Sequence, residues 1–85
     1  MKKVMLYALS TCPFCQMTKQ FFKKHNIPFD FVDVDLLPEA EKEQTVQKVQ
    51  AISGRRAFPV IVIEDEVIVG YDELKIREAL KDELK

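Results

Sequence analysis

Residues 3–35, KVMLYALSTCPFCQMTKQFFKKHNIPFDFVDVD, change their hydrophobic period twice, and this change decides the fold. The first seven of these residues form an apolar run with Val and Tyr, which predicts a buried strand. From Pro13 to about His25, apolar residues recur at three- and four-residue steps, as on one face of a helix. In residues 28–35, Phe and Val largely alternate with Asp, which predicts a second strand. A strand, a helix and a strand in this order form a parallel crossover.

The rest of the chain adds a helix, two strands and a last helix. Residues 38–53 predict a helix that a proline opens, with Gly54 just past its end. Residues 58–63, FPVIVI, predict a buried strand, and residues 64–70 predict a tight turn and a short partner strand. Residues 71–85 predict the closing helix. The order βαβαββα predicts an α/β fold, in which three helices flank a four-stranded mixed sheet.

Polar residues near the ends of these elements predict how the elements begin. Ser10 or Thr11 precedes a proline that suits the first helical position, so either residue is expected to cap the first helix. Asp72 is the expected N-cap of the last helix. Asp33 and Asp35 share one face of the second predicted strand, where a solvated strand end is favoured over a cation site. The buried stripes are predicted from Met17 or Thr18 with Phe21 and Phe22 in the first helix, and from Leu74, Ile76 or Arg77, and Leu80 in the last.

The composition is that of a small soluble globular protein, and it limits the partners. Eighty-five residues allow a single domain, residues 1–85, and 13 basic against 14 acidic residues give no bulk attraction to nucleic acid. The apolar N-terminal stretch stops at Ser10, short of a secretory signal, and no segment reaches the roughly 18–20 apolar residues of a membrane span. We therefore expect a cytoplasmic monomer without nucleic-acid or membrane partners. In that compartment, a close cysteine pair is more often catalytic or metal-binding than structural.

Cys12 and Cys15 are the two cysteines of the chain, and their spacing has several interpretations. A structural zinc site needs about four ligands, whereas this chain adds only His25 to the two thiols. A c-type haem site needs a histidine directly after the second cysteine, where the chain has Gln16. Two core cysteines that meet by chance fit poorly with a cysteine at a predicted helix start. The pattern favours a redox-active dithiol, because Cys-x-x-Cys beside a βαβ unit is typical of thiol–disulfide chemistry.

The predicted helix start gives the two thiols different roles. Positions i and i+3 lie on one helix face, about 5–6 Å apart, which suits a disulfide. Cys12 would lie beside the unpaired amides of the helix N-terminus, where a thiolate, the attacking species, is favoured. Cys15, one turn further along, should be less exposed. We predict that Cys12 attacks a target disulfide and that Cys15 resolves the mixed disulfide, with no metal and no tightly bound cofactor.

Three segments together resemble the glutaredoxins of the thioredoxin superfamily: TCPFC (residues 11–15), GRRAFPVIVI (residues 54–63) and VGYDEL (residues 69–74). They are similar, in order and spacing, to the family's Cys-Pro-Tyr/Phe-Cys, Thr-Val-Pro and Gly-Gly-x-Asp. The resemblance covers almost the whole chain. It implies a thioredoxin-like fold and a thiol–disulfide oxidoreductase whose redox-active disulfide joins Cys12 and Cys15.

The resemblance also implies roles for residues that are far apart in the sequence. Pro59 matches the family's cis-proline, whose loop lies against the active-site cysteines, and Phe58 before it offers backbone groups to an extended substrate. Gly70, Tyr71 and Asp72 match the segment that holds the carboxyl end of glutathione, through amides at a helix start. Around the cysteines, three further residues are expected to support the active site: Thr11, Pro13 and Phe14.

Three positions depart from the family pattern where glutathione would bind. Leu9 stands where the family usually has a lysine, Phe58 stands in place of the valine before the proline, and Val69 replaces the first glycine. The missing lysine removes a charge contact with glutathione, and the bulky residues narrow its groove. Arg55 and Arg56, which are near the proline loop in the sequence, and Lys19 are the cations that we expect to replace the lysine, although a solvated helix face is an equal interpretation of Lys19.

The resemblance leaves the source of electrons open. In a true glutaredoxin, glutathione is the co-substrate, and the protein reduces protein disulfides or glutathione mixed disulfides. Some glutaredoxin-like redoxins are instead reduced by a flavoprotein thioredoxin reductase or a ferredoxin-linked enzyme, and they pass electrons to ribonucleotide reductase. A further alternative is an iron–sulfur cluster carrier that uses Cys12, although Cys15 can close a disulfide instead.

Overall fold

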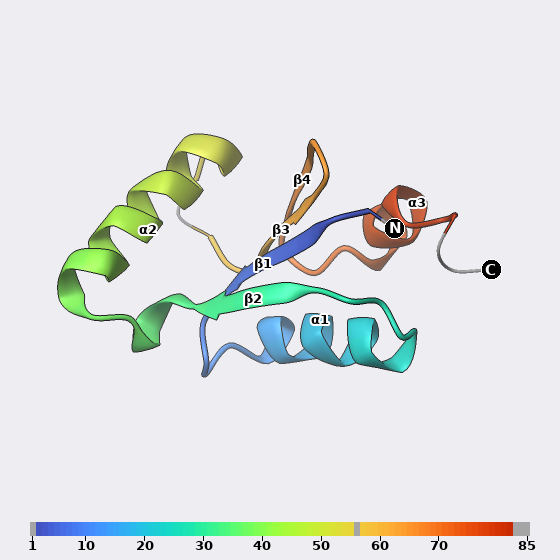
Figure 1. The fold of residues 1–85 in the computed structure, drawn as a ribbon, viewed down its shortest axis with the longest axis horizontal. Coiled ribbons are helices and arrows are strands. Elements are labelled where there is room, and N and C mark those ends of the chain that lie inside the picture. The colour runs from blue at the N-terminus through green and yellow to red at the C-terminus, as the bar shows by residue number, and fades with distance from the viewer. Residues whose placement is uncertain (1, 56, 83–85) are drawn as a thin grey trace.

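The computed structural model describes residues 2–55 and 57–82, and it confirms the predicted order of strands and helices (Figure 1). A short 3-10 turn, η1, follows the second strand. The elements are β1 (Val4–Ala8), α1 (Pro13–Lys24), β2 (Asp30–Asp33), η1 (Val34–Leu36), α2 (Glu39–Ser53), β3 (Val60–Ile63), β4 (Glu66–Val69) and α3 (Glu73–Ala79).

The four strands form one mixed sheet in the order β2-β1-β3-β4. β1 pairs with β2 in parallel, and it pairs with β3 antiparallel on its other side. β3 and β4 complete the sheet as an antiparallel hairpin, with Ile61 opposite Ile68. The parallel pair arises because α1 returns the chain across the sheet, as the crossover pattern predicts.

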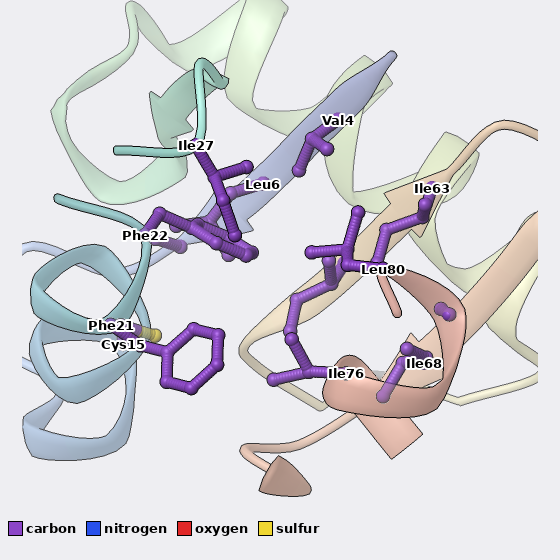
Figure 2. Close-up of a cluster of buried hydrophobic side chains, with 13 residues drawn as sticks. Val4, Leu6, Cys15, Phe21, Phe22, Ile27, Ile63, Ile68, Ile76 and Leu80 are labelled. Atoms are coloured by element: carbon purple, nitrogen blue, oxygen red, sulfur yellow. The ribbon is translucent and has the colours of Figure 1, made fainter. Parts of the chain in front are cut away.

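The two faces of the sheet are covered by different helices (Figure 1). Successive side chains of a strand point to opposite faces, so Leu6 of β1 packs with α1 and α3, while Tyr7 packs with α2. Figure 2 shows the larger cluster, in which side chains of α1 and α3 meet those of β1 and β3. α2 buries only Val49 completely, so its face of the sheet carries the smaller cluster. None of the helices in the described part of the chain is long and apolar enough to cross a bilayer.

The predicted phase of α3 is wrong at Leu74. The Leu74 side chain is 81% exposed, and the buried residues of this helix are Ile76 and Ala79, followed by Leu80 at its end. In α1, Thr18 is buried and Met17 is exposed. α3 ends at Ala79, short of the predicted end, and residues 83–85 of that prediction lie outside the described residues.

Several predicted element ends are also corrected. β2 ends at Asp33, where η1 begins, so Asp35 does not belong to the strand. Pro38 is the N-cap of α2, so the helix begins at Glu39, one residue after its predicted start. Gly54 ends α2 with φ +80°, a left-handed conformation that glycine adopts easily, and this confirms its predicted position past the helix. Asp72 caps α3 as predicted, because its side chain accepts a hydrogen bond from the backbone N–H of Lys75 at 3.1 Å.

Candidate functional site

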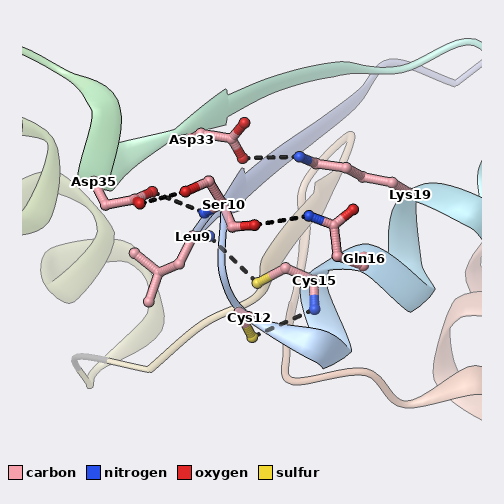
Figure 3. Close-up of polar contacts among 8 residues, drawn as sticks. All are labelled: Leu9, Ser10, Cys12, Cys15, Gln16, Lys19, Asp33 and Asp35. Carbon is pink, nitrogen blue, oxygen red and sulfur yellow. Dashed lines mark hydrogen bonds and ion pairs between the residues drawn. The ribbon is translucent and has the colours of Figure 1, made fainter.

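Cys12 is the N-cap of α1, and Pro13 after it is the first helical residue. The backbone of Cys12 is extended, and its Sγ accepts a hydrogen bond from the backbone N–H of Cys15 at 3.4 Å (Figure 3). The prediction that Ser10 or Thr11 caps this helix is wrong, because the sulfur takes that place. The sulfur therefore lies at the unpaired amides of the helix N-terminus. Cys12 is half-buried, so a partner can still reach it.

Cys15 is fully buried and has a different environment from Cys12. Burial raises the pKa of the Cys15 thiol to about 12, although the backbone N–H of Leu9, which donates to Cys15 Sγ at 3.4 Å, acts in the opposite direction. Cys15 is therefore a neutral thiol at neutral pH. The structure shows both cysteines as free thiols. The predicted asymmetry in exposure between the two cysteines is confirmed.

A hydrogen-bond network holds the loop between β1 and α1 against η1, the turn that follows β2 (Figure 3). The Ser10 backbone N–H donates to one carboxylate oxygen of Asp35 at 2.8 Å, and the Ser10 hydroxyl donates to the other at 2.5 Å. The Gln16 side chain donates to the Ser10 carbonyl at 2.9 Å. The Ser10 hydroxyl and then its N–H lower the pKa of Asp35. Asp35 was predicted at a solvated strand end, and it instead anchors the loop that carries Cys12.

Lys19 lies one helical turn after Cys15 and is not on a solvated face. Its Nζ atom is 2.8 Å from a carboxylate oxygen of Asp33, and the two side chains are only 11% and 17% exposed. The ammonium also lies 4.4 Å from the ring centroid of Phe31. The attraction of Lys19 tends to lower the pKa of Cys15, so this cation acts on the buried thiol. Lys19 is thus engaged with Asp33, and its predicted contact with glutathione stays a prediction.

The residues after α2 place the predicted proline loop beside the segment before α3. The Phe58–Pro59 peptide bond is cis, as predicted, and Pro59 is buried. The Pro59 carbonyl accepts a hydrogen bond from the backbone N–H of Gly70 at 2.7 Å, which joins the two segments. Cys12, Phe58 and Tyr71 all pack at the margin of the larger core cluster. These three residues, which the family resemblance assigns to one site, therefore pack against the same core.

The remaining predicted site residues have distinct positions. Thr11 is exposed in the loop before Cys12, and Phe14 is 58% exposed at the start of α1. Burial, followed by the charge of Glu73, raises the pKa of Tyr71, so its phenol is neutral at pH 7. Arg56 lies outside the described residues. Within residues 2–55 and 57–82, no cluster of three or more His, Cys, Asp or Glu residues could hold a metal ion.

Comparisons with known proteins agree with this geometry. The family model described as Glutaredoxin matches residues 4–68. A glutaredoxin-like 8.6 kDa protein of the rubredoxin operon of Clostridium pasteurianum is 34% identical over 73 residues, which is 86% of this chain and 91% of that protein. The glutaredoxin-like protein NrdH of Lactococcus lactis is 35% identical over 68 residues, 80% of this chain and 86% of the relative.

Solved structures show the same architecture. The crystal structure of the glutaredoxin grx-1 of Archaeoglobus fulgidus superposes with a TM-score of 0.89 and 37% sequence identity, over 95% of this chain and 88% of the other. The fold is therefore the thioredoxin-like fold of glutaredoxins. The chain belongs to the glutaredoxin family.

Proposed function

We propose that this protein is a thiol–disulfide oxidoreductase that reduces protein disulfides through Cys12 and Cys15. The main support for this proposal is that the two thiols have different environments. Cys12 Sγ receives a backbone hydrogen bond at the N-terminus of α1, whereas Cys15 is buried with a pKa of about 12. Cys12 is therefore the thiol that attacks the target, and Cys15 stays protonated until the mixed disulfide has formed.

The reaction has two exchanges of sulfur partners. The Cys12 thiolate attacks one sulfur of a target disulfide, forms a mixed disulfide with it, and releases the other sulfur as a thiolate. Cys15 then loses its proton and attacks Cys12 Sγ, which forms the Cys12–Cys15 disulfide and releases the reduced target. Two electrons pass from the protein to the target, the released thiolates take protons from water, and an external thiol or dithiol must reduce the protein again.

Two cysteine variants test the proposal. Cys12→Ser should abolish reduction of a protein disulfide, because it removes the attacking sulfur. Cys15→Ser should stop at a stable mixed disulfide, visible by mass as an adduct on Cys12. Equal and full activity in both variants would refute the proposed roles.

For the source of electrons, we infer a protein reductase rather than glutathione. Leu9 and Val69 stand where the family pattern has a lysine and a glycine that serve glutathione. Lys19, one of the cations proposed to replace that lysine, is bound to Asp33. The similarity to the NrdH protein of Lactococcus lactis supports ribonucleotide reductase as the acceptor.

The choice of reductant has a direct test. The oxidised protein is incubated with millimolar glutathione in one sample, and with NADPH and a thioredoxin reductase in another. Thiol labelling and mass then report the reduced fraction over time. Fast reduction in the reductase sample alone supports the inference. Fast reduction by glutathione, with a glutathione adduct on Cys12 in Cys15→Ser, would instead make glutathione the reductant.

A further inference from the structure

A groove separate from the cysteines lies between α1 and α3. Its volume is about 270 Å³, and its walls include Met17, Phe21, Lys24, Glu73 and Arg77. Phe21 is buried in its floor, and the guanidinium of Arg77 lies 5.2 Å from the Phe21 ring centroid. The groove therefore combines an aromatic floor with cationic walls.

The groove is joined to the active site by one face of α1. Phe14, Met17, Phe21 and Lys24 follow one another at steps of three, four and three residues, so they lie in one row along the helix. Phe14, between the two cysteines, is 58% exposed, and Met17 is 44% exposed. Exposed apolar side chains thus lead from Cys12 into the groove, and the row ends at a lysine.

The charge at the far end of this row is positive and uncompensated. Glu73 faces Arg77 at 3.7 Å, so its single carboxylate serves that cation. Lys24 is exposed and forms no ion pair with any residue of 2–55 or 57–82. Two cations against one carboxylate leave an excess of one positive charge, whereas the whole chain has a formal net charge of −1. A partner with a carboxylate would therefore be attracted to this end of the row.

We propose that the α1–α3 groove binds an extended acidic segment of the protein whose disulfide reacts with Cys12. An apolar side chain of that segment lies on Met17, and a carboxylate lies at Lys24. The inference rests on the proposed function, and it adds that the partner has an acidic and an apolar side chain near its reactive disulfide.

The helix geometry sets where the carboxylate must be. Cys12 and Lys24 are separated by about 18 Å along α1 at about 1.5 Å per residue. An extended chain covers this distance with about five residues, at about 3.4 Å each. The partner should therefore carry its acidic residue about five positions from its reactive cysteine.

Two peptides test the inference with the full-length protein. Each peptide carries one cysteine as a mixed disulfide with a chromogenic aryl thiol. One peptide has Glu five positions to either side of the cysteine, and the other has Gln at those two positions. The rate of aryl thiol release is measured for the wild type, Lys24→Glu and Lys23→Glu, and each rate is divided by the rate with a small neutral disulfide. Lys23 is a matched control, because it is an exposed lysine in the same helical turn but does not line the groove.

We expect the wild type to react about fivefold faster with the Glu peptide than with the Gln peptide at low salt, which is the size of one exposed charge pair. Lys24→Glu should abolish or reverse this preference, Lys23→Glu should retain it, and added salt should weaken it. No preference in the wild type, or equal loss in both variants, would overturn the docking site. If even the small neutral disulfide failed to react with the wild type, the proposed function itself would be wrong.

Discussion

Replacement of Lys19 by Met should show how much the ion pair between α1 and β2 contributes to stability. Met keeps most of the side-chain length and removes only the ammonium. The Asp33 carboxylate, 17% exposed, would then lose the partner that lies 2.8 Å away, and the Phe31 ring would lose its cation. Removal of one partner costs about 3–5 kcal/mol in a fully buried pair and about 0–1 kcal/mol in an exposed pair. With both side chains mostly buried, we expect a loss of about 2 kcal/mol, or a fall in Tm of about 8–16 °C.

The assay is a double-mutant cycle in urea with the protein kept reduced. Lys19→Met, Asp33→Asn and the double variant are compared with the wild type, and the double variant should recover about 1 kcal/mol or more of the summed losses, because no unpaired carboxylate remains. Lys23→Met, an exposed lysine on the same helix, should change stability by less than about 0.5 kcal/mol. A loss in Lys19→Met no larger than in Lys23→Met, or a coupling near zero, would refute the reasoning and make the pair a solvated contact.

Three further predictions concern the thiol, the loop and the core. In Cys12→Ser, alkylation of Cys15 should be slow at pH 7 and should still rise with pH up to pH 10, because burial, the largest cause of the raised pKa of Cys15, is unchanged in this variant; a plateau below pH 9 would contradict this. Asp35→Asn should destabilise the protein at pH 7, as measured by urea unfolding. This difference from the wild type should become smaller below about pH 4, because a carboxylate with a lowered pKa contributes stability that is lost as pH falls through that pKa. Ile76→Ala should cost about 2–5 kcal/mol because the side chain is fully buried, whereas Leu74→Ala on the same helix should cost less than about 0.5 kcal/mol; equal losses by calorimetry would disprove this assignment of the buried face.

The order of elements was predictable because apolar runs and hydrophobic periods indicate most of the elements, and because Pro38 and Gly54 bound α2. β1 and β3 are apolar on both faces, since helices cover both sides of the sheet. α3 shows where this reasoning fails. The helix has only seven residues, so Leu74 and Ile76 both fit a stripe, and only the contact with the sheet decides between them. Local sequence gives no information on that contact.

The cysteine pair was predictable because its chemistry requires adjacent positions on one helix turn. The ion pair between Lys19 and Asp33 and the hydrogen bonds between Ser10 and Asp35 were not predictable. Asp33 and Asp35 lie two residues apart and were assigned to one solvated strand face. In the structure β2 ends at Asp33, which pairs with Lys19, and η1 turns Asp35 toward Ser10. The position of the strand end, which the pattern of alternating residues does not show, therefore assigns each carboxylate its partner.

The high pKa of Cys15 is compatible with a resolving role, because the second exchange is intramolecular. With a pKa of about 12, only about one thiol in 10⁵ is ionised at pH 7. A well-oriented intramolecular group acts as if present at about 10⁵–10⁸ M, which offsets this fraction. A thiolate of high pKa is also a stronger nucleophile once formed. The N–H of Leu9 and the charge of Lys19 favour that thiolate inside the core. The same burial therefore keeps Cys15 from reacting with outside disulfides, while its proximity to Cys12 makes it fast when a mixed disulfide forms.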